Sequence, residues 1–326
     1  MKPSVKDFSL WCDFIERGFL EQEFLQHINE AHFMGATSNP SIFANAILHS
    51  NAYQEQLKNL RTQPNLSPKA IYEALAIEDI KLAANALSRL YAADKDYGYI
   101  SIEIDPMLSE DTQKSIDEGK RLYETIGYEN VMIKVPATEA GYEVMGALFR
   151  EGINVNATLI FTEKQAAQCA KILDKNAKTN ARAVISIFVS RFDSAIPTPV
   201  DNLPKLGVLN AMLCYEAIEE VGNPRIRPLF ASTGAKLKGL NPDYYITNLI
   251  APHSVNTAPL ATIEAFLSAP QERAIPWLEK KEILKQISQI DMGKSSLESI
   301  QQTLFDNGIK AFKESFSQML TKLGSL

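Results

Sequence analysis

The stretch at residues 99–105 reads Tyr-Ile-Ser-Ile-Glu-Ile-Asp, and it decides the fold. In an extended chain its isoleucines share one face, while Ser101, Glu103 and Asp105 share the other. Strands of a parallel sheet that is covered by helices are usually apolar on both faces. We therefore expect a strand that packs its isoleucines on surrounding helices and turns its polar face toward an enclosed interior.

The same two-faced pattern recurs on other short apolar segments. A buried polar group costs about 1–3 kcal/mol unless it is paired. One such residue is usually a satisfied core hydrogen bond, but polar faces on five strands are hard to explain by core packing. Several of these polar residues, including Glu103, Lys134 and Thr158, fall late in their strands, toward the carboxyl end where barrel active sites are built. The inward-facing residues on the other strands are Ser9, Trp11 and Asp13 on the first strand, Lys134 on the fourth, Asn154, Asn156 and Thr158 on the fifth, and Ser186 on the sixth.

Short apolar segments alternate with longer amphipathic ones along the chain, as in an α/β protein with a parallel sheet. Thr162 with Gln165 forms a capping box, and Ser67-Pro68 predicts another helix start. Eight strand–helix units predict a single (β/α)8 TIM barrel domain over 1–326. We expect additional N- and C-terminal helices, with 284–326 as a C-terminal helical extension. The strands are expected at Ser9–Ile15, Gly35–Ser38, Tyr99–Asp105, Asn130–Pro136, Ile153–Ile160, Ala183–Val189, Arg227–Ser232 and Tyr245–Ala251.

Composition narrows the class of protein and its compartment. The 326 residues are 45% hydrophobic and 22% charged, with a formal net charge of −6, which argues against a nucleic-acid partner. The N-terminal residues have no apolar run of the signal-peptide kind, and no segment is apolar for long enough to span a membrane. Cys12, Cys169 and Cys214 lie apart in apolar stretches, so we expect buried free thiols and a cytoplasmic protein.

The sequence predicts no metal and no cofactor. The four histidines, at 27, 32, 49 and 253, show no close pair or metal-ligand spacing, and no Cys–His cluster occurs. Glu103 and Asp105 could touch a metal, but alternate carboxylates on a strand are more often hydrogen-bonded to their neighbours. No glycine-rich phosphate loop is present.

Lys134 is the residue with the most chemical meaning. Lysine is rarely buried without a reason, and Lys134 stands between Ile133 and Val135 in a strand shielded from bulk water. Burial favours a neutral amine, which is a nucleophile toward carbonyl carbon. A structural Lys–Glu ion pair is the alternative. One amine with the carboxylates of Glu103 and Asp13 suits iminium chemistry on a polyol.

Five blocks of the chain closely resemble the transaldolases, in order and spacing, from Leu10 to about Phe266. They are Gly35–Phe43, Val131–Thr138, Glu151–Phe161, Ser186–Arg191 and Ala231–Lys236. The resemblance implies that Lys134 forms the Schiff base. It implies that Glu103 acts through a water as general acid and base, with Thr158 holding that water, and that Asp13 takes the proton of the C4 hydroxyl.

The resemblance also implies the substrates and the residues that hold them. The substrates are sugar phosphates. Related enzymes are often dimers, and we expect a monomer or homodimer. A dihydroxyacetone unit would stay covalently attached until an aldose phosphate accepts it. The binding residues implied for that unit are Asn39 and Asn156, with Ser186 nearby, and those implied for the phosphate are Arg191, Ser232 and Lys236.

Two features depart from the common pattern. Many transaldolases carry arginine where Gly234 stands, so Lys236 becomes the substitute, as in the branch with a Ser-Thr-Gly-x-Lys pattern. The alternative for Lys236 is a solvated surface lysine. The loop Phe192–Pro204 is long for a barrel connection, and it either covers the phosphate end or is an exposed insertion. A Schiff-base sugar-phosphate aldolase and a non-catalytic phosphosugar-binding barrel remain the competing functions.

Overall fold

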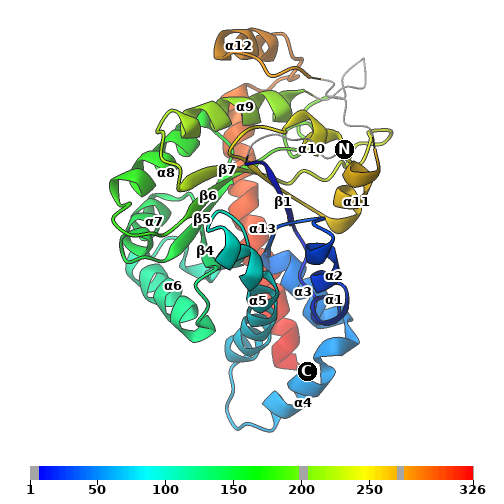
Figure 1. Cartoon of the computed structure of the whole chain (residues 1–326), viewed down its shortest axis with the longest axis vertical. Helices are drawn as coiled ribbons and strands as arrows, with labels where there is room; N and C mark the ends of the chain where they lie inside the picture. The colour runs from blue at the N-terminus through cyan, green and yellow to red at the C-terminus, as the bar shows by residue number, and fades with distance from the viewer. Residues whose placement is uncertain (1–6, 198–204, 270–274, 326) are drawn as a thin grey trace.

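Eight parallel strands close into one barrel in chain order, with β8 pairing back on β1 (Figure 1). The computed structural model describes residues 7–197, 205–269 and 275–325. The barrel confirms the (β/α)8 fold predicted from the two-faced strands. The strands are β1 (Ser9–Cys12), β2 (Gly35–Thr37), β3 (Tyr99–Glu103), β4 (Val131–Pro136), β5 (Asn154–Ile160), β6 (Ala183–Phe188), β7 (Ile226–Ala231) and β8 (Val255–Ala258).

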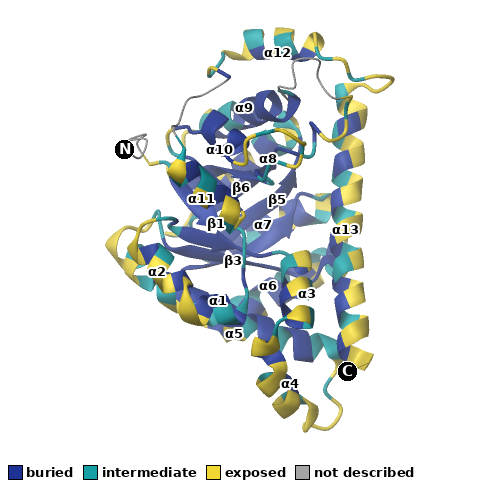
Figure 2. Ribbon diagram, turned by 90° about the vertical axis from the view of Figure 1, so that its right-hand side faces the viewer, coloured by how far each residue is buried: buried dark blue, intermediate teal, exposed yellow. Residues whose placement is uncertain are grey.

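Helices surround the barrel and bury their inner faces against it, as the colouring of Figure 2 shows. The predicted caps are confirmed: Ser67 caps α5, and Thr162 and Gln165 form a complete capping box on α8. The helices are α1 (Arg17–Gln22), α2 (Phe24–Asn29), α3 (Pro40–His49), η1 (Asn51–Tyr53), α4 (Gln54–Arg61), α5 (Pro68–Ala93), η2 (Pro106–Leu108), α6 (Thr112–Ile126), α7 (Glu139–Arg150), α8 (Glu163–Lys175), α9 (Leu206–Glu219), α10 (Tyr244–Asn248), α11 (Leu260–Ser268), α12 (Lys280–Ser288) and α13 (Leu297–Ser325). In the described residues, no helix is both long and apolar enough to cross a membrane.

The predicted eighth strand is wrong. Tyr245–Ala251 begins within helix α10, and the eighth strand is the short segment Val255–Ala258. A short apolar run fits a buried helical turn as well as a buried strand, so its periodicity does not separate the two. Tertiary contacts favour the helix: the Tyr245 hydroxyl donates to Asp193, and Asn248 accepts a hydrogen bond from the Ile275 amide.

The additional helices are present: near the N-terminus, α1 and α2 follow β1, and α3 and α4 follow β2. The first strand ends at Cys12, so Asp13 lies just beyond it. At the other end of the chain, α12 packs on α9, and the long helix α13 runs along one side of the molecule in Figure 2. Residues 198–204 of the predicted Phe192–Pro204 loop lie outside the described residues.

A buried arginine closes the amino end of the barrel. Arg227 on β7 is 4% exposed, and its guanidinium donates to the backbone carbonyls of Asp7, Asp96 and Ser254 and to the Ser9 hydroxyl. These bonds give partners to the Ser9 hydroxyl and to backbone carbonyls at that end. The polar groups near the carboxyl end are left to form a separate site.

A buried ion pair joins α1 to α5 outside the barrel. Arg17 Nε lies 2.5 Å from Asp79 Oδ1, and the Tyr53 hydroxyl donates to Asp79 Oδ2 at 2.7 Å. Burial raises the pKa of Asp79 to about 6, against the opposing charge of Arg17. The arrangement ties the segment between β1 and β3 into one packed unit.

We expect Asp79→Ala to lower the free energy of unfolding by about 3–5 kcal/mol, because it leaves the Arg17 guanidinium buried without its partner. Urea denaturation followed by circular dichroism measures the loss. Glu78→Ala, on the exposed side of the same helix, is the control and should change stability little. Equal stabilities for both variants would show that the ion pair contributes nothing.

Candidate active site

Strand register brings an amine and a carboxylate together inside the barrel. Glu103 on β3 pairs with Lys134 on β4, and Lys134 pairs with Asn156 on β5. Lys134 Nζ lies 3.8 Å from Glu103 Oε2 and donates to the Ser38 carbonyl at 3.0 Å. Lys134 is 5% exposed and Glu103 is 6% exposed. The amine is therefore shielded from bulk water and held by one hydrogen bond, with a carboxylate just beyond hydrogen-bonding distance.

Glu103 is poised to exchange a proton near neutral pH. Burial raises its pKa to about 7, the charge of Lys134 opposes that rise, and the nearby Asp13 adds to it. Neither Glu103 carboxylate oxygen has a hydrogen-bond partner in the described chain, and the buried Thr158 hydroxyl also lacks one there. Unpaired buried polar atoms are costly. A water or a substrate hydroxyl is the kind of group that would satisfy them.

Asp13 is oriented by two threonines that the sequence analysis missed. Thr37 at the end of β2 donates to Asp13 Oδ1 at 2.7 Å, and its oxygen lies 2.7 Å from the Thr257 hydroxyl on β8. Since Thr37 has one proton and gives it to Asp13, Thr257 must donate to Thr37. Burial raises the pKa of Asp13, whereas the charge of Lys134 and the Thr37 hydrogen bond lower it. Thr37 lies inside a block already quoted; Thr257 was missed because the eighth strand was misplaced.

The two asparagines predicted to bind substrate are each held by hydrogen bonds. Asn156 is fully buried, donates to the Ser101 hydroxyl at 3.0 Å, and accepts from the Ser186 hydroxyl at 2.7 Å, so the orientation of its amide is fixed. Asn39 caps helix α3 by accepting from the Ile42 amide at 3.0 Å. That bond uses the Asn39 oxygen and leaves its amide nitrogen as a donor.

Two cations stand near each other after β6 and β7. The Arg191 guanidinium carbon lies 4.8 Å from the centre of the Phe188 ring, and burial lowers the Arg191 pKa. Partial burial and the positive charge of Arg191 lower the pKa of Lys236, so the two groups repel each other. Neither has an ion-pair partner within residues 7–197, 205–269 and 275–325. An anion between them would relieve the repulsion.

Ser232 follows β7 and lies beside Ser190, the residue before Arg191. Its hydroxyl lies 3.1 Å from the Ser190 hydroxyl, and its backbone adopts a left-handed φ of 56°. That region is strained for a residue with a side chain, and such strain collects at ligand-binding sites. The structure thus brings the predicted residues together in two groups, one around Lys134 and one around Arg191.

Glu103 and Asp105, the two carboxylates considered as metal ligands, have different surroundings. Asp105 accepts from the Lys69 ammonium at 2.6 Å and from the Met107 amide at 2.8 Å, so its charge is neutralised away from Glu103. In the described residues, no three His, Cys, Asp or Glu side chains are grouped to hold a metal. Cys12, Cys169 and Cys214 are free and buried, as predicted.

The expectation that no two histidines lie close is wrong. His27 Nδ1 and His32 Nδ1 are 2.9 Å apart. Helix α2 ends at Asn29, and the left-handed backbone at Ala31 turns the chain back on itself. The pair lies ahead of β2, at the opposite end of the barrel from Lys134.

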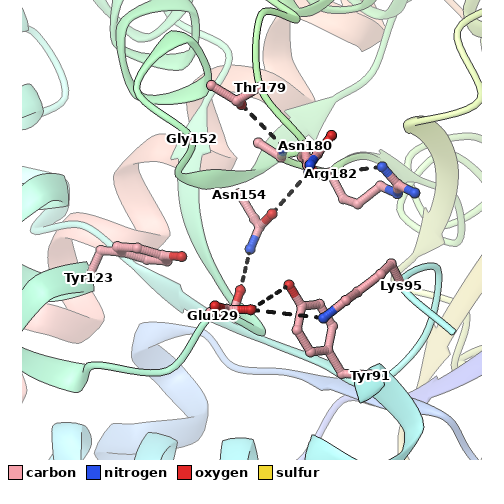
Figure 3. A pocket seen from close by; sticks show the side chains of 10 residues that line it. Tyr91, Lys95, Tyr123, Glu129, Gly152, Asn154, Thr179, Asn180 and Arg182 are labelled. Carbon is pink, nitrogen blue, oxygen red and sulfur yellow. Dashed lines mark hydrogen bonds and ion pairs between the residues drawn. The ribbon is translucent and has the colours of Figure 1, made fainter. Parts of the chain in front are cut away.

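Apart from the candidate site, a pocket lies at the amino end of the barrel (Figure 3). It has a volume of about 420 Å³ and includes residues that precede β4, β5 and β6. Its charges are largely paired with their neighbours: Lys95 lies 3.8 Å from Glu129, and Arg182 Nε donates to Asp96 at 2.8 Å. Asn154, from the polar face of β5, lines this pocket, but Lys134, Glu103, Asp13 and Thr158 do not.

The chain is similar to known proteins over nearly its whole length. Residues 10–323 match the family described as transaldolase/fructose-6-phosphate aldolase. The chain is 47% identical to a transaldolase of Helicobacter pylori (strain HPAG1), over 97% of this chain and 99% of that protein. It is 44% identical to a transaldolase of Campylobacter jejuni (strain RM1221), over 98% of this chain and 100% of that protein.

The raised pKa of Glu103 predicts how stability responds to pH. A carboxyl whose folded pKa rises from 4.5 to about 7 is harder to ionise in the folded state, so its stabilising contribution is lost as pH rises through this range. Glu103→Gln does not titrate. Its melting temperature relative to the native chain should therefore increase between pH 4.5 and 7.5.

Scanning calorimetry at several pH values measures this difference. The exposed-site variant Glu143→Gln is the control, and its melting temperature should stay parallel to that of the native chain. A Glu103→Gln difference that does not change with pH would mean that Glu103 ionises as readily in the folded state as in the unfolded chain.

Proposed function

We propose that this chain, which belongs to the transaldolase/fructose-6-phosphate aldolase family, transfers a dihydroxyacetone unit between sugar phosphates through a Schiff base on Lys134. The donor is sedoheptulose 7-phosphate or fructose 6-phosphate, and the acceptor is glyceraldehyde 3-phosphate or erythrose 4-phosphate, as in the non-oxidative pentose phosphate pathway. One observation carries the proposal: the buried Lys134 amine lies 3.8 Å from the Glu103 carboxylate.

The first step joins the substrate to the protein. The Lys134 amine attacks the C2 carbonyl of the ketose, and the carbinolamine then loses water to form an iminium ion. Glu103, with its pKa near 7, donates the proton that departs with the hydroxyl and later takes one back. The water that relays the proton would occupy the space between Glu103 and Thr158, whose oxygens lack partners in the described chain.

The second step breaks the C3–C4 bond. Asp13 takes the proton of the C4 hydroxyl, the C4 oxygen becomes the carbonyl of the departing aldose, and the electron pair moves to the iminium as a neutral enamine. Thr37 keeps the Asp13 carboxylate oriented toward the site. Asn39 and Asn156 bond the hydroxyls of the retained fragment, with Ser186 fixing the Asn156 amide. Addition to an acceptor aldehyde reverses these steps.

The iminium is the electron sink, so this chemistry uses only side chains of the protein. We propose that no metal and no cofactor takes part. The protein is a cytoplasmic monomer or homodimer, without a nucleic-acid or membrane partner. Residues 1–326 form one catalytic domain, because the 284–326 extension contributes α13, which packs on α3, α5 and β5. Its phosphate site is of the Ser-Thr-Gly-x-Lys type, with Lys236 as the second cation.

Two alternatives use the same fold. A sugar-phosphate aldolase would release the fragment after protonation instead of transferring it, and the identity to proteins called transaldolase favours transfer. A non-catalytic sugar-binding barrel would not need Lys134, Glu103, Asp13 and Thr158 together. Assays with and without erythrose 4-phosphate separate the first alternative from transfer.

We expect borohydride with fructose 6-phosphate to inactivate the protein and to add a reduced dihydroxyacetone unit to the peptide that contains Lys134. The reason is that reduction traps the iminium formed by the one amine that lies beside Glu103. Peptide mass mapping locates the label. Lys134→Met is the matched control and should take up no label, and modification of Lys236 instead would contradict the assignment.

The two cations predict how the phosphate is held. Arg191→Ala should raise KM for fructose 6-phosphate roughly 10–100-fold, since a hydrogen bond to a charged group contributes about 1.5–3 kcal/mol. Lys236→Ala should raise it less, because an ammonium gives a less directional contact than a guanidinium. Borohydride trapping with unphosphorylated dihydroxyacetone is the control, and its concentration dependence should be unchanged. Equal losses for both substrates would show a structural role.

A further inference from the structure

One face of the C-terminal helix α13 is buried along its length. Its buried positions recur every three or four residues, so they form a single stripe. The helix packs on β5, η2, α3 and α5, and Figure 2 shows it spanning the side toward which β5 points. The stripe consists of Ile300, Leu304, Gly308, Phe312, Phe316, Met319 and Leu323.

Phe312 in this stripe faces the reactive amine. Lys134 Nζ lies 5.9 Å from the centre of the Phe312 ring, and Phe312 is 6% exposed. One turn farther along, Phe316 packs edge-on against Tyr72 at 5.2 Å between ring centres. The side chain that α13 presents toward Lys134 is therefore aromatic, and Phe312 can neither donate a proton nor hold a water molecule there.

Gly308, one turn before Phe312, lies at a close approach of the helix to the barrel. A Cβ at this position would lie 2.9 Å from Leu159 Cδ2 and 3.5 Å from Arg191 Nη1. Glycine inside a helix is destabilising by about 0.5–1 kcal/mol relative to alanine. Leu159 itself has a left-handed φ of 61°, where the β5–β6 register shifts. Both the glycine and the strained leucine serve a tight contact between α13 and the site.

We propose that Phe312 is a specificity-determining residue that directs the Lys134 enamine toward the acceptor sugar. Gly308 sets how closely α13, which carries Phe312, packs over Lys134. The proposal rests on the proposed function. In transfer, C3 of the enamine attacks the acceptor aldehyde, a carbon–carbon bond forms, and the new alkoxide takes back the proton that Asp13 holds. Water then hydrolyses the product iminium to the new ketose and the free Lys134 amine. In the competing path, C3 takes a proton from water, and a water molecule then hydrolyses the iminium to free dihydroxyacetone and the amine.

The two outcomes differ at C3 of the enamine. Protonation of C3 needs a proton delivered from solvent, whereas the acceptor sugar brings its own electrophile and is bound through its phosphate. Both paths end with hydrolysis of an iminium, so only the step at C3 separates them. An apolar ring above Lys134 excludes unbound water while the acceptor enters from the Arg191 end. The ring thereby favours transfer over release without touching either carboxylate.

The test measures how many dihydroxyacetone molecules are released for each one transferred. Fructose 6-phosphate is the donor, and erythrose 4-phosphate is the acceptor. Phe312→Ala should raise this ratio by about tenfold. Phe305→Ala is the matched control: it removes the same side chain from the same helix, at a position that lines a groove with α7 and α8 instead of the site. Its ratio should stay at the native value.

Gly308→Ala provides a second, independent arm. Alanine favours the helix, but its methyl group would lie 2.9 Å from Leu159 Cδ2, so the melting temperature is measured first and the ratio is read where the variant is folded. The methyl group displaces α13 or the Leu159 side chain and loosens the contact between them, so the ratio should rise here too. If Phe312→Ala fails to fold, the Gly308→Ala ratio decides the question.

A native ratio in every folded variant would overturn the proposal. Borohydride trapping keeps this failure separate from a failure of the proposed function. Normal labelling of Lys134 with an unchanged ratio rejects the role of α13 alone, whereas absence of label in the native chain rejects the Schiff base itself.

Discussion

The pairing of Glu103 with Lys134 across β3 and β4 is the interaction on which the rest of the structure depends. It places an amine and a carboxylate in a space almost closed to water, 3.8 Å apart. Burial of charge is expensive, and a loose pair of this kind recovers little of that cost. The arrangement is a site kept ready for a substrate, and the surrounding barrel has to supply the stability that the site lacks.

The barrel does this by dividing its polar interior between two ends. At the amino end, Arg227 donates to several backbone carbonyls, so these carbonyls and the guanidinium are hydrogen-bonded to one another. At the carboxyl end, oxygens of Glu103 and Thr158 remain without partners in the described chain. The difference separates stability from chemistry along the barrel axis, as is usual for this fold.

Neighbouring residues give Glu103 and Asp13, the two carboxylates at the carboxyl end, different environments. Glu103 accepts no hydrogen bond from any described residue, and burial brings its pKa to about 7. Asp13 accepts a hydrogen bond from Thr37, which lowers its pKa against the effect of burial. Burial raises the pKa of both groups, but Asp13 has a hydrogen-bond donor that stabilises its anion, whereas Glu103 has none among the described residues. Such a division suits the two proton transfers that iminium chemistry requires.

Local pattern was enough to predict much of this protein. Alternation of polar and apolar residues placed seven strands and the inward faces that carry Lys134, Glu103 and Asn156, because the side-chain period of a strand is set by backbone geometry alone. The eighth strand was missed, and Thr257 with it, because a run such as Tyr245–Ala251 suits a buried helix equally well. Only the tertiary structure placed Phe312 above Lys134. The two residues are far apart in sequence, and the packing of α13 across the barrel decides their contact.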